Sequence, residues 1–231
     1  MKILSWNIER PRNDKKLNKN NFIIELIEKE NPDIIFLTET NSIIGFSPSY
    51  FSLETTALPK TFSHISKPHE YFSGENRTTI FSKYKFINTF ETYDEYTSVC
   101  GEVETPFGNL ILYGSIIGCF GGKDQYFKED LLKQKEQIKA ISMKGNLCYS
   151  GDFNISFSGY PYPNNAARSE MSNFFKEIHL VNTTEKNEDS VIHIVLSEKF
   201  INGLNIKRQR KRIERKISDH DLIMIDVFKA E

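Results

Sequence analysis

Short apolar runs alternate with a stretch of helical periodicity in the first part of this chain. Residues 3–6 form an apolar run of strand length. The apolar positions of residues 22–27 recur at helical spacing, and Asn31-Pro32 ends that segment. A continuous apolar run follows at residues 33–37, as a strand covered on both faces requires. The order strand, helix, strand predicts a parallel crossover.

The middle of the chain mixes irregular segments with a hairpin pattern. Residues 42–76 are rich in Ser, Pro and aromatic residues and are predicted to form a long loop or insertion. Residues 78–82 have the composition of a strand. Residues 99–104 and 110–113 flank a turn-forming stretch that contains Pro and Gly, which is typical of a β-hairpin.

The last part of the chain alternates helical and extended patterns. A glycine-rich loop is predicted at 115–122. Helices are predicted from Asp124 to about residue 142 and over 166–178, and strands over 147–151, 191–196 and 222–228. Strands joined by both crossover helices and hairpins require mixed sheets. No repeat or linker divides the chain, so we predict one α/β domain over residues 1–231.

Composition limits the classes of protein that this chain can be. Hydrophobic residues make up 39% of the sequence, which is enough to build a sizeable core. The 3 cysteines are odd in number and lack CxxC spacing, so neither a disulfide framework nor a zinc cluster is expected. The sequence contains no apolar run long enough to span a membrane, and its first residues resemble a strand more than a signal peptide. The cytoplasm is therefore the expected compartment, and nothing indicates a protein partner.

The charge of the chain is unevenly distributed. The net charge is −1, but residues 207–216 hold seven basic residues against one acid, a local charge of +6. Two interpretations explain this stretch equally well. It is either a surface that faces phosphate groups or a solvated edge strand whose charges block aggregation.

Polar residues recur where the predicted strands end. Asn7 and Glu9 follow the first strand, Glu39 follows the second, and the stretch Gly151-Asp152-Phe153-Asn154 follows the strand at 147. Asp219-His220-Asp221 precedes the last strand. Each of these also reads as an ordinary turn, cap or surface residue. Their joint position favours a functional site, because ligand sites of α/β folds form at strand ends.

These motifs, in this order and spanning residues 6–221, resemble the endonuclease/exonuclease/phosphatase superfamily. That group includes deoxyribonucleases, apurinic endonucleases, inositol-polyphosphate phosphatases and sphingomyelinases. The resemblance implies a four-layer α/β sandwich, in which two mixed sheets pack face to face with helices outside. It also implies hydrolysis of phosphoesters with a divalent metal ion.

The resemblance implies a role for each motif residue. Glu39 would be the principal metal ligand, with Asn7 beside it and Asp219 nearby. An all-oxygen set of Glu, Asp and Asn suits Mg²⁺, with Mn²⁺ as the alternative, better than zinc. Asp152 would orient or deprotonate the attacking water. General-base catalysis of this kind accelerates a reaction by about 10²–10⁴-fold.

Further residues would hold the substrate. The resemblance implies that Asn154 helps to hold the water and the phosphate, that His220 donates to a phosphate oxygen, and that Asp219 supports catalysis. Glu9 occupies a position that is often an acid near the metal. Tyr113 falls near a phosphate-contacting tyrosine of some nucleases. Candidate phosphate contacts on the basic stretch are Lys207, Arg208, Arg210 and Arg212.

One position departs from the family pattern. An aspartate in the strand before the last motif usually supports the catalytic histidine, and Ile192 stands at that position. Either Asp189 replaces it, or the alignment shifts by a few residues, or the site is weakened. Three hypotheses follow: a nuclease that cleaves nucleic acid, a phosphatase or phosphodiesterase that acts on a small phosphoester, and a binding protein on a weakened catalytic scaffold.

Overall fold

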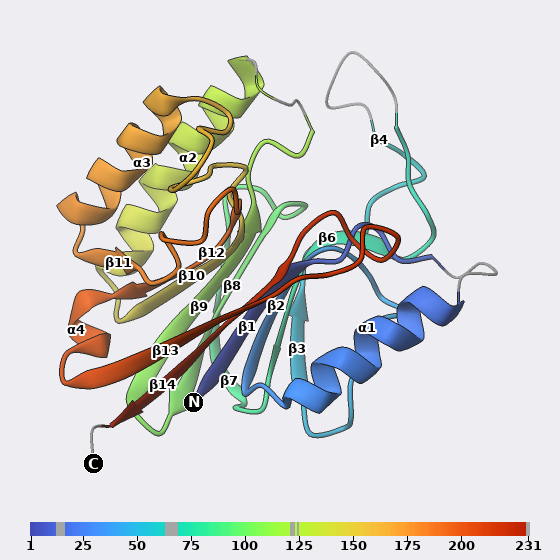
Figure 1. Ribbon diagram of the computed structural model, residues 1–231, viewed down its shortest axis with the longest axis horizontal. Coiled ribbons are helices and arrows are strands. Elements are labelled where there is room, and N and C mark those ends of the chain that lie inside the picture. The colour runs from blue at the N-terminus through green and yellow to red at the C-terminus, as the bar shows by residue number, and fades with distance from the viewer. Residues whose placement is uncertain (13–16, 63–68, 121–122, 124, 230–231) are drawn as a thin grey trace.

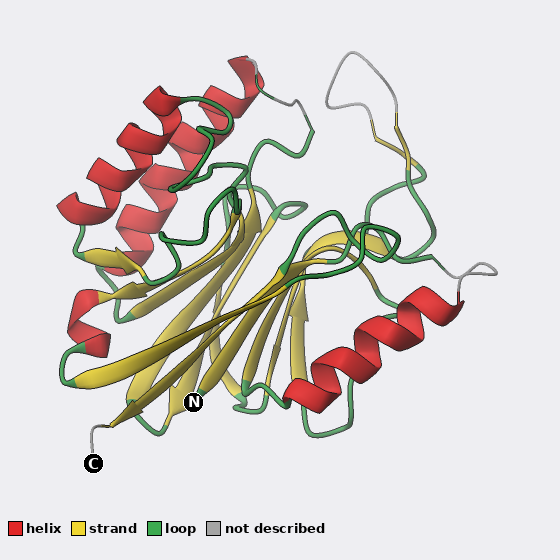
Figure 2. Ribbon diagram, viewed as in Figure 1, coloured by secondary structure: helices red, strands yellow, loops and turns green. Residues whose placement is uncertain are grey.

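The computed structural model describes residues 1–12, 17–62, 69–120, 123 and 125–229. Within these residues, two six-stranded sheets pack face to face, and helices cover their outer faces (Figure 1). The helix α1 (Leu17–Glu30) covers one sheet, and the helices α2 (Gln125–Ser142) and α3 (Asn165–Glu177) cover the other (Figure 2). The predicted four-layer α/β sandwich with two mixed sheets is confirmed.

The first sheet carries both ends of the described chain. Its strands, in spatial order, are β13 (Leu204–Lys211), β14 (Leu222–Lys229), β1 (Lys2–Asn7), β2 (Ile34–Asn41), β6 (Glu75–Ser82) and β3 (Phe51–Glu54). The pair β1–β2 is parallel, and its crossover through α1 confirms the predicted strand, helix, strand opening. The neighbouring pairs β1–β14 and β2–β6 are antiparallel, which makes the sheet mixed.

The second sheet is assembled from the middle of the chain. Its strands are, in spatial order, β11 (Leu180–Asn182), β12 (Ile192–Ser197), β10 (Leu147–Asp152), β9 (Gly108–Ile116), β8 (Ser98–Thr105) and β7 (Phe86–Phe90). The predicted hairpin is β8–β9, which turns at Gly108 with a φ of 104°. Three short elements lie outside both sheets, namely β4 (Thr61–Phe62), β5 (His69–Glu70) and α4 (Glu198–Ile201).

The apolar residues form three layers that hold this sandwich together. Between the sheets, Phe36 and Ile225 of the first sheet share a core with Leu112 and Ile194 of the second. The two outer layers pack each sheet against its own helices. Because apolar burial is the main favourable contribution to folding, the three layers fix how the two sheets face each other.

Some elements differ from the sequence-based expectations. The stretch 42–76, predicted as a loop, contains β3, β4, β5 and the start of β6. The strand β3 is largely exposed and only four residues long, although its sequence Phe51-Ser52-Leu53-Glu54 alternates apolar and polar side chains. The basic stretch begins in β13, which lies at the edge of its sheet, as the edge-strand interpretation predicts. Asp124, the predicted cap of α2, lies outside the described residues. No helix in the described part of the chain is long and apolar enough to cross a membrane.

His193 of β12 is enclosed by the core of the second sheet. Its side chain is buried, with the hydroxyl oxygen of Thr184 3.2 Å from Nδ1 and the carbonyl oxygen of Ser190 2.9 Å from Nε2. Burial lowers the pKa of this imidazole from 6.5 to about 4. His193 is therefore a neutral packing residue at neutral pH.

Acidification should destabilise the fold through His193. The unfolded chain binds this proton below pH 6.5, whereas the folded chain resists it down to about pH 4. Stability should therefore fall across that window, by about 3 kcal/mol from this residue alone. Chemical denaturation between pH 7 and pH 4 measures the change. The His193→Gln variant should lose less stability across the window. His179→Gln, at an exposed histidine, should match the wild type, and an equal pH dependence in all three proteins would contradict this expectation.

Candidate functional site

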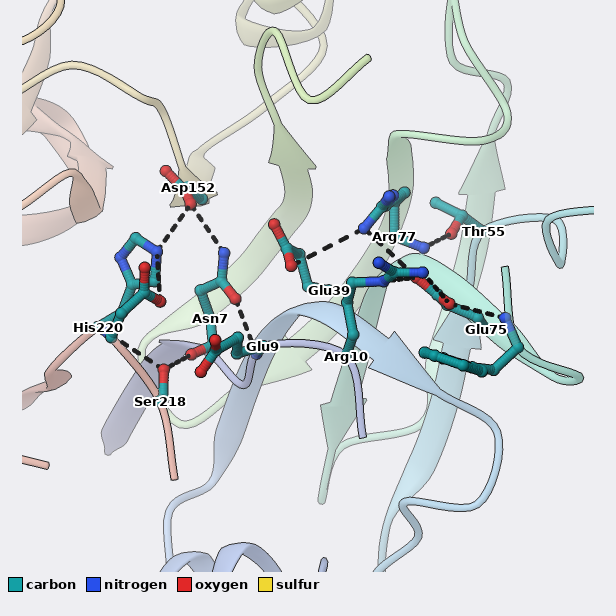
Figure 3. A network of polar contacts seen from close by, with 12 residues as sticks. Asn7, Glu9, Arg10, Glu39, Thr55, Glu75, Arg77, Asp152, Ser218 and His220 are labelled. Carbon is teal, nitrogen blue, oxygen red and sulfur yellow. Dashed lines mark hydrogen bonds and ion pairs between the residues drawn. The ribbon is translucent and has the colours of Figure 1, made fainter. Parts of the chain in front are cut away.

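Four strand ends from both sheets meet at one edge of the sandwich. Asn7 is the last residue of β1, Glu39 lies near the end of β2, and Asp152 is the last residue of β10. His220 lies two residues before β14. Figure 3 shows these side chains pointing toward one another. The sandwich therefore brings together residues that are as much as 213 positions apart in the sequence.

A hydrogen bond between Asn7 and Asp152 connects the two sheets at this edge. Asn7 Nδ2 donates to Asp152 Oδ2 at 2.9 Å, and the exposed fractions of the two residues are 1% and 2%. The amide oxygen of Asn7 accepts from the backbone N–H of Glu9 at 2.9 Å. Because both ends of the amide have partners, its orientation is fixed, and with it the position of the Asp152 carboxylate.

The loop before β14 places the His220 imidazole beside Asp152. His220 Nε2 lies 3.9 Å from Asp152 Oδ2 and 3.3 Å from Asp219 Oδ1. The backbone of His220 is anchored on both sides: the Trp6 indole donates to its carbonyl at 3.0 Å, and its N–H donates to the Ser218 hydroxyl at 3.0 Å. The Ser218 hydroxyl in turn donates to the carbonyl of Asn7 at 2.7 Å.

Glu39 is the acid at the end of β2, and its backbone has a φ of 49°. Burial raises the pKa of Glu39, and the negative charge of Asp152 adds to the rise. Arg77 of β6, a hydrogen bond from Asn7 and His220 act in the opposite direction. The site thus brings a buried carboxylate, Asp152, near a partly buried one, Glu39, an arrangement that a bound cation stabilises.

The turn after β10 depends on a glycine. Gly151 has a φ of 141°, and a Cβ atom there would lie 2.0 Å from the carbonyl oxygen of Ser115. Beyond it, the Asn154 backbone N–H donates to Asp152 Oδ1 at 2.9 Å, and Asn154 Nδ2 donates to the carbonyl of Ile117 at 2.8 Å. The second carboxylate oxygen of Asp152 is therefore fixed as well, and the amide oxygen of Asn154 remains available to a ligand.

The donors in this site suit a hard cation. Glu39 supplies a carboxylate and Asn7 an amide oxygen, and Mg²⁺ commonly binds through one or two carboxylates while it keeps several waters. Within the described residues, no three His, Cys, Asp or Glu side chains form a group that could hold a metal ion by themselves. Oxygen donors such as those of Glu39 and Asn7 fit Mg²⁺ or Mn²⁺ better than zinc, which prefers nitrogen and sulfur ligands.

The structure places two other predicted residues at the periphery. Asp219 has 59% of its side chain exposed, contacts the His220 imidazole, and accepts a hydrogen bond from Arg215 at its carbonyl. Glu9 is exposed as well, and its carboxylate lies 3.9 Å from Lys19 Nζ. A metal-binding role for either residue stays a prediction.

The expectation that Tyr113 contacts phosphate is wrong. Tyr113 is fully buried beneath α2, and its hydroxyl donates to Gln137 Oε1 at 2.5 Å. A strand has two faces, and the side chain of Tyr113 lies on the face that packs against the helices. It therefore belongs to the outer core and cannot reach a substrate.

The basic residues divide between two places. Arg210 and Arg212 line a hollow of about 450 Å³ beside His220, together with Arg215. Arg210 is ion-paired with Asp221 at 2.8 Å. Arg208 instead donates to the carbonyl of Thr183 at 2.5 Å, and neither it nor Lys207 lines the hollow. Part of the basic stretch thus borders the site, and part of it has a structural role.

The position of the expected aspartate is filled by an apolar side chain. Ile192 is paired in register with Asp152, is 1% exposed and belongs to the core between the sheets. The contacts of Asp189 do not place it in the role of that aspartate: its carboxylate accepts a hydrogen bond from the backbone N–H of Tyr160 at 2.6 Å. The acid nearest to the imidazole is Asp219.

Sequence reasoning missed Arg77 and Glu75 of β6, which adjoin Glu39. Arg77 NH1 lies 3.9 Å from Glu39 Oε2 and 3.6 Å from Glu75 Oε1. The available signal was a charged pair at the start of a strand that otherwise contains Thr, Ile and Phe. Charged residues are seldom fully buried without a partner, so such a pair indicates a polar site.

A family model described as the endonuclease/exonuclease/phosphatase family matches residues 4–220 of this chain. Among solved structures, an endonuclease/exonuclease/phosphatase protein from Beutenbergia cavernae DSM 12333 superposes with a TM-score of 0.69 at 14% identity, covering 100% of this chain and 72% of that one. The endonuclease domain of TRAS1, a telomere-specific non-LTR retrotransposon, gives 0.68 at 15% identity, covering 99% and 97%.

The AP endonuclease LMAP from Leishmania major gives a TM-score of 0.69 at 11% identity, covering 100% of this chain and 88% of that one. At these low sequence identities, the similarity to the solved structures shows a shared fold and nothing beyond it. No curated protein sequence matches this chain significantly.

Gly151→Ala should destabilise the fold strongly. The added Cβ would collide with the backbone of Ser115, and an alanine strains a φ of 141°, so a loss of about 3 kcal/mol or more is expected. Gly203→Ala is the matched control, because its φ of 75° is also unfavourable but no atom lies within 4 Å of the new Cβ. That control should cost about 1 kcal/mol. Thermal unfolding compares the two variants, and equal losses would contradict the expected steric role of Gly151.

Proposed function

The chain belongs to the endonuclease/exonuclease/phosphatase family, and on that premise we propose that it is a Mg²⁺- or Mn²⁺-dependent phosphodiesterase that cleaves nucleic acid. Members of this family are hydrolytic phosphoesterases and generally depend on a divalent metal ion. The observation that carries the proposal is the meeting of Asp152, His220 and Glu39 around Asn7 at one edge of the sandwich.

In this proposal Asp152 is the general base. Its carboxylate is positioned by Asn7 on one oxygen and by the backbone of Asn154 on the other. A carboxylate fixed in this way can accept the proton of a water that attacks phosphorus. The amide oxygen of Asn154 would accept a hydrogen bond from the same water.

His220 would act on the phosphate. Its Nε2 lies at the Asp152 side of the site, where a donor can reach an oxygen that gains charge in the transition state. Glu39 and Asn7 would hold the metal ion, which when bound offsets the negative charge of the phosphate. Asp219, at 3.3 Å from Nε2, would stabilise the protonated imidazole.

The arginines beside the site are the residues that would contact nucleic acid. Arg210, Arg212 and Arg215 line the hollow beside His220 together with four acids, Glu188, Asp189, Asp219 and Asp221, and Arg210 is ion-paired with Asp221. A row of arginines next to a catalytic centre can follow successive phosphates of a polynucleotide. The proteins of similar structure include an AP endonuclease and a retrotransposon endonuclease, which supports the same substrate class.

Plasmid DNA and single-stranded oligonucleotides should be cut in the presence of Mg²⁺ and left intact in EDTA. Asp152→Asn keeps the shape of the side chain but removes the base, and should lower the rate by about 10²–10⁴-fold. Lys139→Gln, at an exposed residue of α2, is the control that should keep the wild-type rate. Cleavage that survives EDTA would rule out the metal-dependent proposal. Hydrolysis of small phosphoesters with DNA and RNA untouched would assign the site to a small substrate instead.

When the pH is lowered, the metal affinity of this site should begin to fall at a higher pH than is usual for a glutamate ligand. Burial raises the pKa of Glu39 above 4.5, so this carboxyl group keeps its proton at pH values where an exposed glutamate is ionised. A protonated carboxyl group does not bind Mg²⁺, so affinity should decline as the pH falls through that raised value. Calorimetric titration with Mn²⁺ between pH 8 and pH 5 measures this. Glu39→Gln should bind weakly at every pH, and a wild-type affinity that stays constant when the titration is extended down to pH 4.5 would contradict the expectation.

A further inference from the structure

Arg77 is a buried arginine next to the proposed metal ligand. The residue is 5% exposed, and its NH1 atom lies 3.9 Å from Glu39 Oε2. Figure 3 shows the guanidinium reaching toward Glu39 from the side opposite to Asp152 and His220. The ring centroids of Tyr71 and Phe120 lie 5.0 and 5.7 Å from its Cζ atom, so the rings confine the guanidinium.

The other acid near Arg77 already has partners. Glu75 is fully buried, and Arg10 contacts both of its oxygens, with Nε 2.6 Å from Oε1 and NH2 3.1 Å from Oε2. The backbone N–H of Phe72 also donates to Oε2 at 2.9 Å. Two arginines therefore share one glutamate, and the charge of Glu75 is largely balanced by Arg10. Among the described residues, the other carboxylate in an ion pair with Arg77 is that of Glu39.

One donor of Arg77 has no acceptor. The Nε atom is buried and makes no hydrogen bond to any described residue. Nearly all buried donors in folded proteins are hydrogen-bonded, and an exception calls for an explanation such as a ligand. A guanidinium with an unpaired, buried donor beside the carboxylate that is proposed to hold the metal ion can bind a phosphate oxygen, because arginine binds phosphate through several parallel N–H groups.

Charge balance leads to the same conclusion. A divalent cation held by Glu39 would lie close to the positive charge of Arg77, and like charges at short range repel. The repulsion is relieved if an anion contacts both cations. An arginine that only neutralised Glu39 would instead compete with the metal ion for that carboxylate.

We infer that Arg77 is a phosphate-binding residue, which contacts a non-bridging oxygen of the substrate on the Glu39 side of the site. The inference rests on the proposed function and adds a substrate contact to it. The substrate is then held from two sides, by His220 and by Arg77. A ligand suited to this arrangement is a phosphodiester anion that can contact the metal ion and the guanidinium together.

Binding linkage tests the inference without any measurement of catalysis. The probe is dimethyl phosphate, a phosphodiester anion, at equal ionic strength with and without the anion. Mg²⁺ binding is followed by calorimetry and by the fluorescence of Trp6, the one tryptophan of the chain, whose indole contacts the His220 carbonyl. Dimethyl phosphate should tighten Mg²⁺ binding to the wild type by about five-fold or more, because the coupling between two ligands is reciprocal.

Arg77→Gln should bind Mg²⁺ at least as tightly as the wild type when no anion is present, since a nearby positive charge is lost. Its coupling with dimethyl phosphate should fall to less than about two-fold. Lys139→Gln removes an exposed charge on α2 and should keep the full coupling. A coupling in Arg77→Gln equal to that of the wild type would overturn the inference. So would weaker Mg²⁺ binding to Arg77→Gln without the anion, which would show that Arg77 supports Glu39 and not the substrate.

A second variant guards against a folding defect at this buried position. If thermal unfolding shows that Arg77→Gln is not folded, Arg77→Lys carries the test, because it keeps the charge and lacks Nε. Its coupling should be weaker than that of the wild type, and unchanged coupling would overturn the inference. A wild type that binds neither Mg²⁺ nor Mn²⁺ would refute the proposed function itself. A wild type that binds Mg²⁺ and cleaves nucleic acid, with coupling independent of Arg77, would refute this inference alone.

Discussion

The hydrogen bond between Asn7 and Asp152 is the contact on which the arrangement of the site depends. It joins β1 of one sheet to β10 of the other, directly above the apolar core that holds the two sheets face to face. Apolar contacts carry no directional information, so the core alone fixes the distance between the sheets but not the position of each side chain. A buried, directional hydrogen bond between the two strand ends supplies that position. The Glu9 N–H holds the Asn7 side chain through its Oδ1, and the Asn154 N–H holds the Asp152 side chain through its Oδ1.

The same burial that orders the site makes it electrostatically unfavourable without a ligand. Glu39 and Asp152 come from different sheets and face each other where solvent is limited, and the raised pKa of Glu39 reflects this. Arg77 offsets part of the negative charge but leaves its own Nε without an acceptor. A site with crowded acids and an open donor gains free energy when a cation and an anion bind together. Such a gain is what a metal-dependent phosphoesterase needs for its ion and its substrate.

Sequence was informative where local pattern and chemistry coincide. The apolar run before Gly151 and the polar residues after it predicted both β10 and the position of Asp152. Edge elements were harder to predict, because β3 has only four residues and the two apolar residues of β13 are followed by a run of basic and polar ones. Tyr113 was misassigned for a related reason. Its neighbours in β9 are also apolar, so the sequence did not reveal which face of the strand points to the helices.

Arg77 could not be assigned from sequence, because its importance comes from neighbours in other elements. It meets Glu39 of β2, shares Glu75 with Arg10, and lies over the rings of Tyr71 and Phe120. A single sequence shows only that two charged residues, Glu75 and Arg77, interrupt the apolar pattern at the start of a strand that continues with Thr, Ile and Phe. The pairing of β2 with β6 turns that interruption into a feature of the site.

Ile192 and Arg77 change the charge of the site in the same direction. The family pattern places an aspartate at the position of Ile192, where it would pair in register with Asp152 and add another acid to the buried edge of the sheets. Ile192 instead extends the apolar core, while the backbone contacts of Trp6 and Ser218 hold the loop that carries His220. With Ile192 at the position of the expected aspartate and Arg77 beside Glu39, the pocket is less negative than the sequence-based expectation. That balance favours an anionic substrate, and it transfers part of the support of the imidazole from the strand to the loop.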